Sequence, residues 1–171
     1  KWINAVRTSV PEGELRAQMT PSMVEQRYGN PISMTKVNGK YILDFGQNMA
    51  GWIGFMPRGE KGDSIIVRYA EKLNSDGSIY TANLRNANST DIYVCNGKEQ
   101  AHLWKPTFVY HGFRYAEVSN LATAKKEDFT AFTVGDDMLS TGELTTSDTI
   151  LNKVIHNAFW GIKSNYKGMP V

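Results

Sequence analysis

The sequence predicts a mainly β fold, an antiparallel β-sandwich followed by one C-terminal amphipathic helix. Segments of alternating apolar and polar residues, rich in β-branched side chains, run from about Leu15 to Ser147. Glycine, asparagine, aspartate and proline interrupt them roughly every ten residues, which is typical of a sandwich or barrel. After Ser147 the spacing of apolar residues becomes helical.

The composition is that of a globular domain. With 171 residues, of which 41% are hydrophobic and 21% charged, the chain can bury a core without metals or disulfides. A net charge of +2 and the lack of a long basic run argue against a nucleic-acid partner. One cysteine excludes an internal disulfide and a cysteine-rich zinc site. No apolar run reaches the roughly 18 residues of a membrane span, so no membrane partner is expected.

The first fourteen residues lack periodicity, and residues 1–14 are interpreted as a lead-in segment from a preceding domain. A β-sandwich domain is expected over residues 15–147. Asn38-Gly39 is the preferred pair for a type I′ hairpin and is expected to let Val37 pair with Tyr41. Nine short strands, which suit two packed sheets, are predicted at residues 23–27, 33–37, 41–44, 51–56, 64–71, 91–95, 112–118, 129–134 and 142–145.

Residues 148–171 are predicted to contain one amphipathic helix. Ser147 or Asp148 can accept hydrogen bonds from its first free amides, and Gly168 with Pro170 ends any continuation. Because an apolar helix face must be buried, we expect the helix to fold back on the sandwich, to pair with another chain or to be poorly ordered. Seven residues form this face: Ile150, Leu151, Val154, Ile155, Ala158, Phe159 and Ile162.

Several stretches resemble one family in both order and spacing. They are YILDFGQNMAGW at residues 41–52, RYAE at 68–71, YTANLR at 80–85 continuing to Thr90-Asp91, FVYHGFRY at 108–115 and NAFWGIKSN at 157–165. These stretches resemble the concanavalin-like, or jelly-roll type, β-sandwich domain that precedes the catalytic (α/α)6 barrel of bacterial α-L-rhamnosidases, glycoside hydrolase family 78. The resemblance covers most of the chain from about Leu15 onward.

The resemblance implies a supporting piece of a larger enzyme. In the family, the general acid comes from an acid-rich motif that follows the position of Pro170-Val171. Residues 148–171 are therefore expected to correspond to the first helix of a truncated barrel. No catalytic residue of the family maps onto this chain, and the piece alone is predicted to be inactive. The parent enzyme is expected to hydrolyse terminal α-L-rhamnosyl residues from glycosides with inversion and without a cofactor, and its barrel is the expected partner.

Local motifs supply no catalytic site of their own. Glycosidic cleavage usually needs two carboxyl groups facing one sugar, whereas the adjacent Asp136 and Asp137 would point to opposite faces of a strand and are interpreted as a solvated turn pair. The histidines, His102, His111 and His156, lack ligand spacing, so no metal site is predicted.

A dense aromatic cluster lies between Trp104 and Tyr115. Sugar rings stack on aromatic planes, but a strand would bury Phe113 and Tyr115 on one face and place Arg114 on the other, so core or interdomain packing is favoured. An Arg85–Asp91 ion pair is predicted to hold the polar loop at residues 80–91, and the resemblance implies that this loop abuts the barrel. The candidate contacts with substrate or with a neighbouring domain are Arg85, Asp91, Tyr110, His111 and Arg114.

Two alternative functions stay open. A carbohydrate-binding module for rhamnosylated glycans would require an exposed, coplanar aromatic platform. The second alternative is a stand-alone structural or adhesion domain. The single helix after the sandwich argues against it, because a complete domain would rarely end with one helix of a barrel. Rhamnose-containing glycans and self-association through the C-terminal helix are further partner hypotheses. The natural glycoside and the oligomeric state are left open, and for this bacterial family a periplasmic or secreted location is preferred over a cytoplasmic one.

Overall fold

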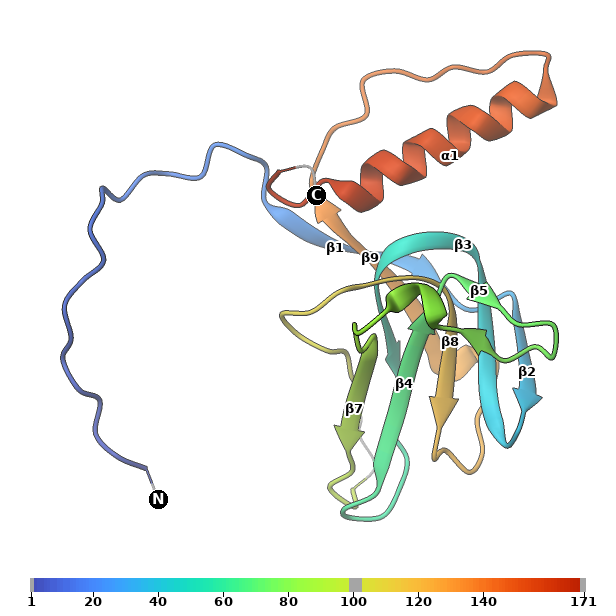
Figure 1. Cartoon of the computed structure of the whole chain (residues 1–171), viewed down its shortest axis with the longest axis horizontal. Helices are drawn as coiled ribbons and strands as arrows, with labels where there is room; N and C mark the ends of the chain where they lie inside the picture. Colours follow the sequence, from blue (N-terminus) through green and yellow to red (C-terminus); the bar gives the residue numbers. More distant parts are fainter. Residues whose placement is uncertain (1, 99–102, 170–171) are drawn as a thin grey trace.

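The computed structural model describes residues 2–98 and 103–169 as an antiparallel β fold with a C-terminal helix (Figure 1). The strands are β1 (Met23–Gly29), β2 (Ser33–Val37), β3 (Lys40–Phe55), β4 (Ser64–Ala70), β5 (Lys72–Leu73), β6 (Ile79–Tyr80), β7 (Thr90–Val94), β8 (His111–Ser119) and β9 (Phe129–Asp136). Two 3-10 turns, η1 (Ala82–Leu84) and η2 (Lys126–Asp128), and the helix α1 (Thr149–Asn165) complete the elements. This confirms the predicted fold class.

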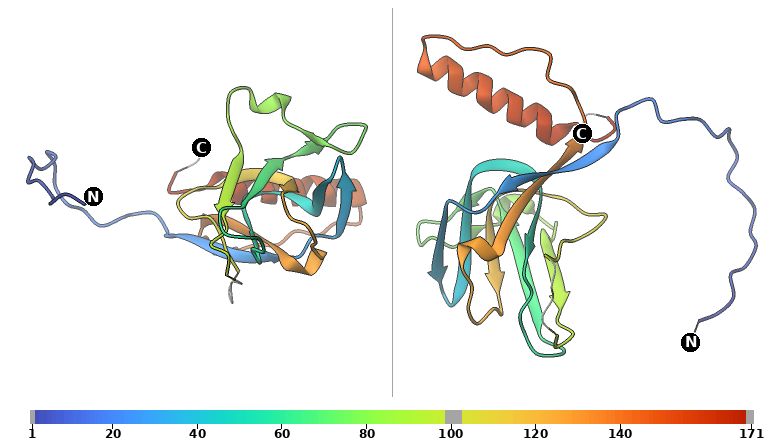
Figure 2. Two further views of the ribbon diagram at one scale, coloured as in Figure 1. Left: turned by 90° about the horizontal axis from the view of Figure 1, so that it is seen from below. Right: turned by 180° about the vertical axis from the view of Figure 1, so that it is seen from behind.

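Seven strands form one curled sheet, and β5 and β6 form a separate hairpin. The order in the sheet is β1-β9-β3-β8-β4-β7, with β2 also paired to β3, and every pairing is antiparallel. The sixteen-residue β3 pairs with β2 near its start, with β8 on both sides of its bend and with β9 near its end. Figures 1 and 2 show β3 arching over one end of the body, so that the sheet wraps around its own core.

The predicted strands at residues 41–44 and 51–56 are therefore two halves of β3. The register between β3 and β8 shifts between Asp44 and Met49, and Gly46 lies there with φ +79°. A side chain at this position would need the left-handed conformation that glycine adopts without strain. The irregularity lets one strand serve both halves of the sheet.

The main core lies inside the curl. Phe55 is fully buried and packs edge-on against Tyr93 and Trp104, and Phe113 packs likewise on Phe45. A second, smaller cluster on the other face joins Ile42, Ala70 and Ile79, the last of which comes from the β5–β6 hairpin. Throughout residues 2–98 and 103–169, no buried side-chain nitrogen or oxygen lacks a hydrogen-bond partner.

Two predictions of local secondary structure are wrong. Residues 142–145 are not a strand, and Leu144 is largely exposed. The type I′ turn is present, with positive φ at both Asn38 and Gly39, but a two-residue loop pairs Val37 with Lys40.

The prediction that Phe113 and Tyr115 share one face of the strand is also wrong. Phe113 belongs to the main core, whereas Tyr115 packs on the second cluster. The register shift of β3 lies opposite this stretch of β8, and it breaks the simple alternation of side chains along the strand.

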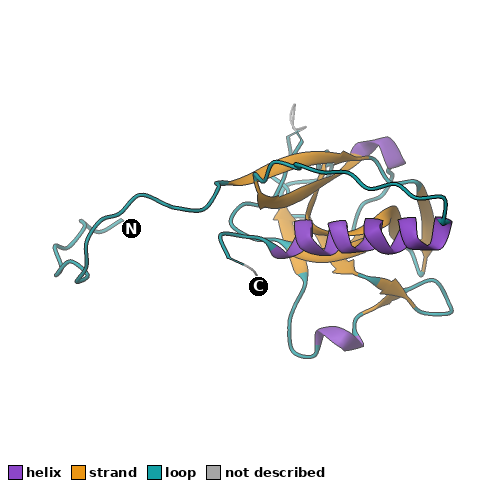
Figure 3. Ribbon diagram, turned by 90° about the horizontal axis from the view of Figure 1, so that it is seen from above, coloured by secondary structure: helices purple, strands orange, loops and turns teal. Residues whose placement is uncertain are grey.

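The helix α1 begins as predicted. Asp148 is its N-cap, and Oδ1 accepts hydrogen bonds from the amides of Ile150 at 2.7 Å and Leu151 at 3.1 Å. Figure 3 shows α1 lying across the body, with the segment that follows β9 running beside it. The helix does fold back on the sandwich, yet none of its residues is buried. At the other end, residues 2–20 are exposed and lie outside any strand or helix.

Candidate functional site

A buried polar network joins β4, β7 and β8. The Tyr69 hydroxyl donates to Asp91 Oδ2 at 2.8 Å, and His111 Nε2 lies 3.0 Å from Asp91 Oδ1. The Ser89 hydroxyl lies 3.1 Å from His111 Nδ1. If Nε2 carries the proton and donates to the carboxylate, Nδ1 accepts the hydroxyl, and every member of the network is satisfied.

Stacking and burial hold this network rigid. The Tyr69 and His111 rings are stacked with centroids 4.2 Å apart, and the Tyr69 oxygen also accepts the amide hydrogen of Ile53 at 3.3 Å. Burial, and then the negative charge of Asp91, raise the pKa of the Tyr69 phenol well above its ordinary value. The network therefore fixes the loop before β7, where the Tyr69 amide also donates to Ser89 O at 3.0 Å.

Ser89, His111 and Asp91 have the residue types of a hydrolytic triad, but their setting is structural. A nucleophilic serine must face a substrate, with donors positioned for the developing oxyanion. Ser89 is not among the residues that line the cavities described below. The Asp91 carboxylate is shared with Tyr69 in the interior, and we assign the network to loop positioning.

The predicted Arg85–Asp91 ion pair is absent from the ion pairs between described residues. Asp91 points inward, where Tyr69 and His111 already occupy both of its oxygens. Arg85 follows η1 with φ +54° and is exposed.

Arg114 instead fixes the bend of β3. It donates from Nε to Asp44 Oδ1 at 2.8 Å and from Nη2 to Asp44 Oδ2 at 2.9 Å. The amide of Gly46 also donates to Asp44 at 2.7 Å. The bonded guanidinium holds the pKa of the Asp44 carboxyl below its usual value, Gly46 adds to the effect, and partial burial opposes it.

One side of α1 contacts the sandwich. His156 Nε2 lies 3.0 Å from Gln47 Oε1, Trp160 packs edge-on against Tyr28, and Lys163 donates to Gln26 at 2.9 Å. These helix residues are spaced by four and three positions and share one side. That side is not the one formed by the seven apolar residues, which at 100° per residue cover the opposite arc.

The chain after α1 is tied to the end of β9. Asp136 accepts the amide hydrogen of Gly168 at 2.8 Å, and its own amide donates to Tyr166 O at 3.0 Å. A Cβ at Gly135 would lie 2.8 Å from Lys163 O, so glycine permits this close approach. Asp136 is therefore an anchor, which corrects the prediction of a solvated turn pair with Asp137.

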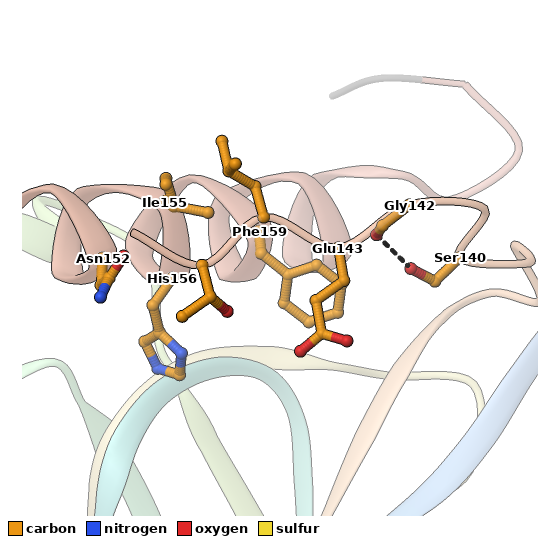
Figure 4. Close-up of a pocket in the computed structure, with 9 residues that line it drawn as sticks. Ser140, Gly142, Glu143, Asn152, Ile155, His156 and Phe159 are labelled. Carbon is orange, nitrogen blue, oxygen red and sulfur yellow. Dashed lines mark hydrogen bonds between the residues drawn. The ribbon is translucent and has the colours of Figure 1, made fainter. Parts of the chain in front are cut away.

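A cavity of about 410 Å³ separates α1 from the segment beside it. Figure 4 shows Asn152, His156 and Phe159 coming from the helix and Glu143 from the facing segment. Among the described residues, Glu143 is the one carboxylate in its lining, so this lining lacks the pair of acids that glycosidic cleavage usually needs.

A smaller polar depression, here called the junction hollow, has a volume of about 240 Å³. It lies between the bend of β3, the start of β8 and the end of α1, beside the candidate residue Tyr110. Its lining residues are Asn48, Met49, Ala50, Glu71, Tyr110, Gly112, Ser164, Asn165 and Lys167.

An apolar groove of about 580 Å³ is also lined by Tyr110 and includes Trp52 and Phe108. Phe108 is fully exposed and has φ +60°. Trp104 and Phe113, which belong to the predicted aromatic cluster, pack in the core instead. The aromatic residues thus divide between core and surface.

The described residues contain neither a metal-binding cluster nor a membrane-spanning helix. Within the described part of the chain, no group of three histidine, cysteine, aspartate or glutamate residues could hold a metal ion. His102 lies outside that part. None of the described helices combines the length and apolar character needed to cross a membrane.

Sequence reasoning found Asp91, His111 and Arg114 but not the residues that complete their contacts. Tyr69 lies within the RYAE stretch that resembled the family, which was a usable signal. Asp44 and Ser89 carry no local signal, because their partners are 70 and 22 residues away in the chain.

Comparison with known proteins gives a consistent result. The sequence model of the bacterial alpha-L-rhamnosidase concanavalin-like domain matches residues 34–135. An alpha-L-rhamnosidase of Streptomyces avermitilis is 38% identical over 133 residues, which are 77% of this chain and 13% of that protein. One of Formosa agariphila is 31% identical over 99% of this chain and 18% of its own length.

Solved structures agree. The alpha-L-rhamnosidase from Dictyoglumus thermophilum superposes with a TM-score of 0.85 at 34% identity, over 92% of this chain and 18% of that one. The Streptomyces avermitilis alpha-L-rhamnosidase complexed with L-rhamnose gives 0.83 at 34% identity, over 91% of this chain and 15% of that one. The chain spans less than a fifth of the length of these relatives.

Proposed function

Because this chain belongs to the family of bacterial alpha-L-rhamnosidase concanavalin-like domains, we propose that it is the supporting β-sandwich of an α-L-rhamnosidase. Its role is to hold and orient the catalytic barrel that removes terminal α-L-rhamnosyl residues from glycosides with inversion. Residues 15–147 supply the sandwich, residues 1–14 lead in from a preceding domain, and residues 148–171 supply the first helix of the barrel.

One observation carries the proposal, which is the unburied apolar face of α1. The sandwich encloses its own core, while Ile150, Val154 and Phe159 remain about half to three quarters exposed. Burial of each such side chain stabilises a protein by roughly 1.5–3 kcal/mol. The helix is fixed to the sandwich by its other side, so the apolar face points to where further helices would pack.

The chain itself is assigned no bond-cleaving step. Inverting hydrolysis needs one acid to protonate the leaving oxygen and one base to activate water. Asp44 is paired with Arg114, Asp91 is committed to the interior network, and Glu117 is buried between two cations. None of these three carboxylates is free to act on a substrate.

The five candidate residues then have two roles. Asp91, His111 and Arg114 position loops at the end of the sandwich that faces α1. Arg85 and Tyr110 are exposed there and are proposed to contact the neighbouring domain. The terminal segment with its exposed Trp2 is proposed to pack on the domain that precedes it.

A chimera tests this function. The matching segment of the Streptomyces avermitilis relative is replaced by this chain, and the release of nitrophenol from p-nitrophenyl α-L-rhamnoside is measured. We expect the chimera to be active, a variant with the segment deleted to be inactive, and this chain alone to release nothing. An active deletion variant would refute the scaffold role.

A matched pair of charge substitutions locates the interface. Val154→Asp places a charge in the exposed apolar face, whereas Lys153→Asp places one on the same helix outside that face. The isolated chain should tolerate both, because both side chains are exposed. In the chimera, Val154→Asp should abolish activity and Lys153→Asp should preserve it. Equal activity of the two chimeras would contradict the proposed interface.

A further inference from the structure

We propose that the junction hollow binds the ring of a neutral sugar, an activity beyond mechanical support. Its volume of about 240 Å³ is that of a small site, below the usual range of drug-sized pockets. The sandwich supplies one wall and the chain at the end of α1 supplies the other, so the hollow exists only where the two elements meet.

Glu71 and Asn48 provide matched polar groups at the rim. Asn48 Nδ2 donates to Glu71 Oε1 at 2.8 Å, and Asn83 Nδ2 lies 3.5 Å from Glu71 Oε2. A carboxylate only accepts hydrogen bonds, whereas an amide both donates and accepts them. Each hydroxyl of a sugar also does both, so neighbouring hydroxyls can bind the carboxylate and the amide together.

Tyr110 and Lys167 also line the hollow. Lys167 Nζ lies 4.6 Å from the centroid of the Tyr110 ring, and it also donates to Ser164 O. The Tyr110 side chain is 44% exposed, which leaves apolar ring surface for the C–H groups of a sugar. Partial burial removes water from the Lys167 ammonium group and so lowers its pKa, while the charge of Asp136 opposes this shift. A sugar hydroxyl could accept a hydrogen bond from this ammonium group.

The charges at the hollow select against other ligand classes. The Glu71 carboxylate repels phosphate and carboxylate ligands, and Lys167 repels cations. The polar rim disfavours an apolar ligand, because its groups would lose water without gaining partners. A neutral molecule with many hydroxyls and one apolar face fits these requirements.

Gly112 lines the hollow, and a larger side chain at this position would fill it. A Cβ built there meets only Glu71 Oε1, at 3.9 Å, and Gly112 pairs with Ala50 in regular strand geometry. A larger side chain therefore fits the strand, where β-branched residues are favoured, but occupies the space of the ligand.

The test is a titration of the 15N-labelled chain with L-rhamnose, and with D-glucose as a second probe, followed by amide chemical shifts. We expect saturable shifts confined to residues 48–50, 112 and 164–167. Gly112→Val should reduce affinity at least tenfold, and Glu71→Gln should weaken it severalfold. Gly161→Ala, at an exposed helix position with open space around it, should leave affinity unchanged.

Three results would overturn the proposal. The first is a lack of saturation at about 100 mM sugar, which is roughly a hundredfold above a Kd of 1 mM. The others are shifts centred on the groove around Phe108, and an affinity of folded Gly112→Val equal to that of the unsubstituted chain. Should Gly112→Val fail to fold, unchanged affinity in Glu71→Gln overturns it instead. The activity of the chimera does not depend on this site, so failure here leaves the scaffold role standing.

Discussion

The sheet and the helix of this chain differ in how they treat apolar surface. In β9 every residue from 129 to 135 is buried, and aromatic rings of the core pack in pairs, such as Phe55 with Trp104 and Phe129. In α1 no residue is buried, although the helix also carries large apolar side chains such as Leu151 and Phe159. The helix contacts the sheet mainly through polar and aromatic side chains on its other side.

This difference indicates that the two regions have different requirements for stability. The sandwich satisfies its own apolar and polar groups, so its fold should not depend on another domain. The helix is oriented by a few contacts and keeps its apolar face available. We infer that the sandwich carries the stability of the chain and that α1 carries its capacity to associate.

The largest expected effect separates two phenylalanines. Phe55 is fully buried, and Phe55→Ala should lower the free energy of unfolding by about 3–5 kcal/mol. Phe159 is 49% exposed, and Phe159→Ala should lower it by less than about 1 kcal/mol. Urea denaturation measures both. Comparable losses would show that α1 is part of the same core.

Tyr69→Phe tests the buried network. It removes the hydroxyl that donates to Asp91 and accepts from Ile53, and leaving such buried groups unpaired costs about 1–3 kcal/mol. Tyr80→Phe, at an exposed position, serves as the control and should change the unfolding midpoint little. Equal midpoints for the two variants would contradict the structural role of the network.

The same residue predicts an alkaline dependence. The phenol pKa is higher in the folded state than the ordinary value of 10.0, so the unfolded chain loses its proton first as pH rises. Stability from Tyr69 is therefore complete below pH 10.0 and falls above it. Tyr69→Phe should flatten this decline in urea titrations. An unchanged slope above that pH would contradict the assignment.

Asp148→Ala tests the start of the helix. Loss of the cap that binds Ile150 and Leu151 should destabilise α1 by about 1 kcal/mol. Because the sandwich does not depend on the helix, far-ultraviolet circular dichroism should report reduced helicity while the urea midpoint of the sheet stays fixed. Ser147→Ala is the control. A lower midpoint of the whole chain would instead couple the two regions.

Arg114→Gln should give the smallest effect, about 0.5–1 kcal/mol for a partly exposed ion pair. The Asp44 pKa is depressed from 3.8 in the folded state, so its contribution is present above that pH and is lost as pH falls through the folded value. Arg114→Gln should weaken this acid dependence in urea titrations, and Arg16→Gln, in a fully exposed pair, should not. Identical acid profiles for the two variants would contradict the clasp at the β3 bend.

The sequence predicted the elements that depend on local pattern. The turn at Asn38-Gly39, the strand at residues 33–37 and the cap at Asp148 follow from residue types and spacing, and the structure contains all three. The alternating residues 142–145 were wrongly predicted as a strand, because an alternating segment forms a strand only where a partner strand lies beside it.

The contacts that define the site depend on long-range pairing. Arg85 and Asp91 are close in sequence and opposite in charge, which favoured an ion pair, but β7 turns Asp91 toward Tyr69 and His111. Likewise, Arg114 meets Asp44 only because β3 and β8 are neighbours with a shifted register. The spacing of residues in the sequence predicts neither contact.

Native-state hydrogen exchange on the intact chain tests the central claim most directly. If the sandwich is the stable unit and α1 is held by a few contacts, amides of β9 should exchange only through global unfolding, whereas amides of α1 should exchange through a local opening of much lower free energy. Equal opening free energies for β9 and α1 would contradict the account.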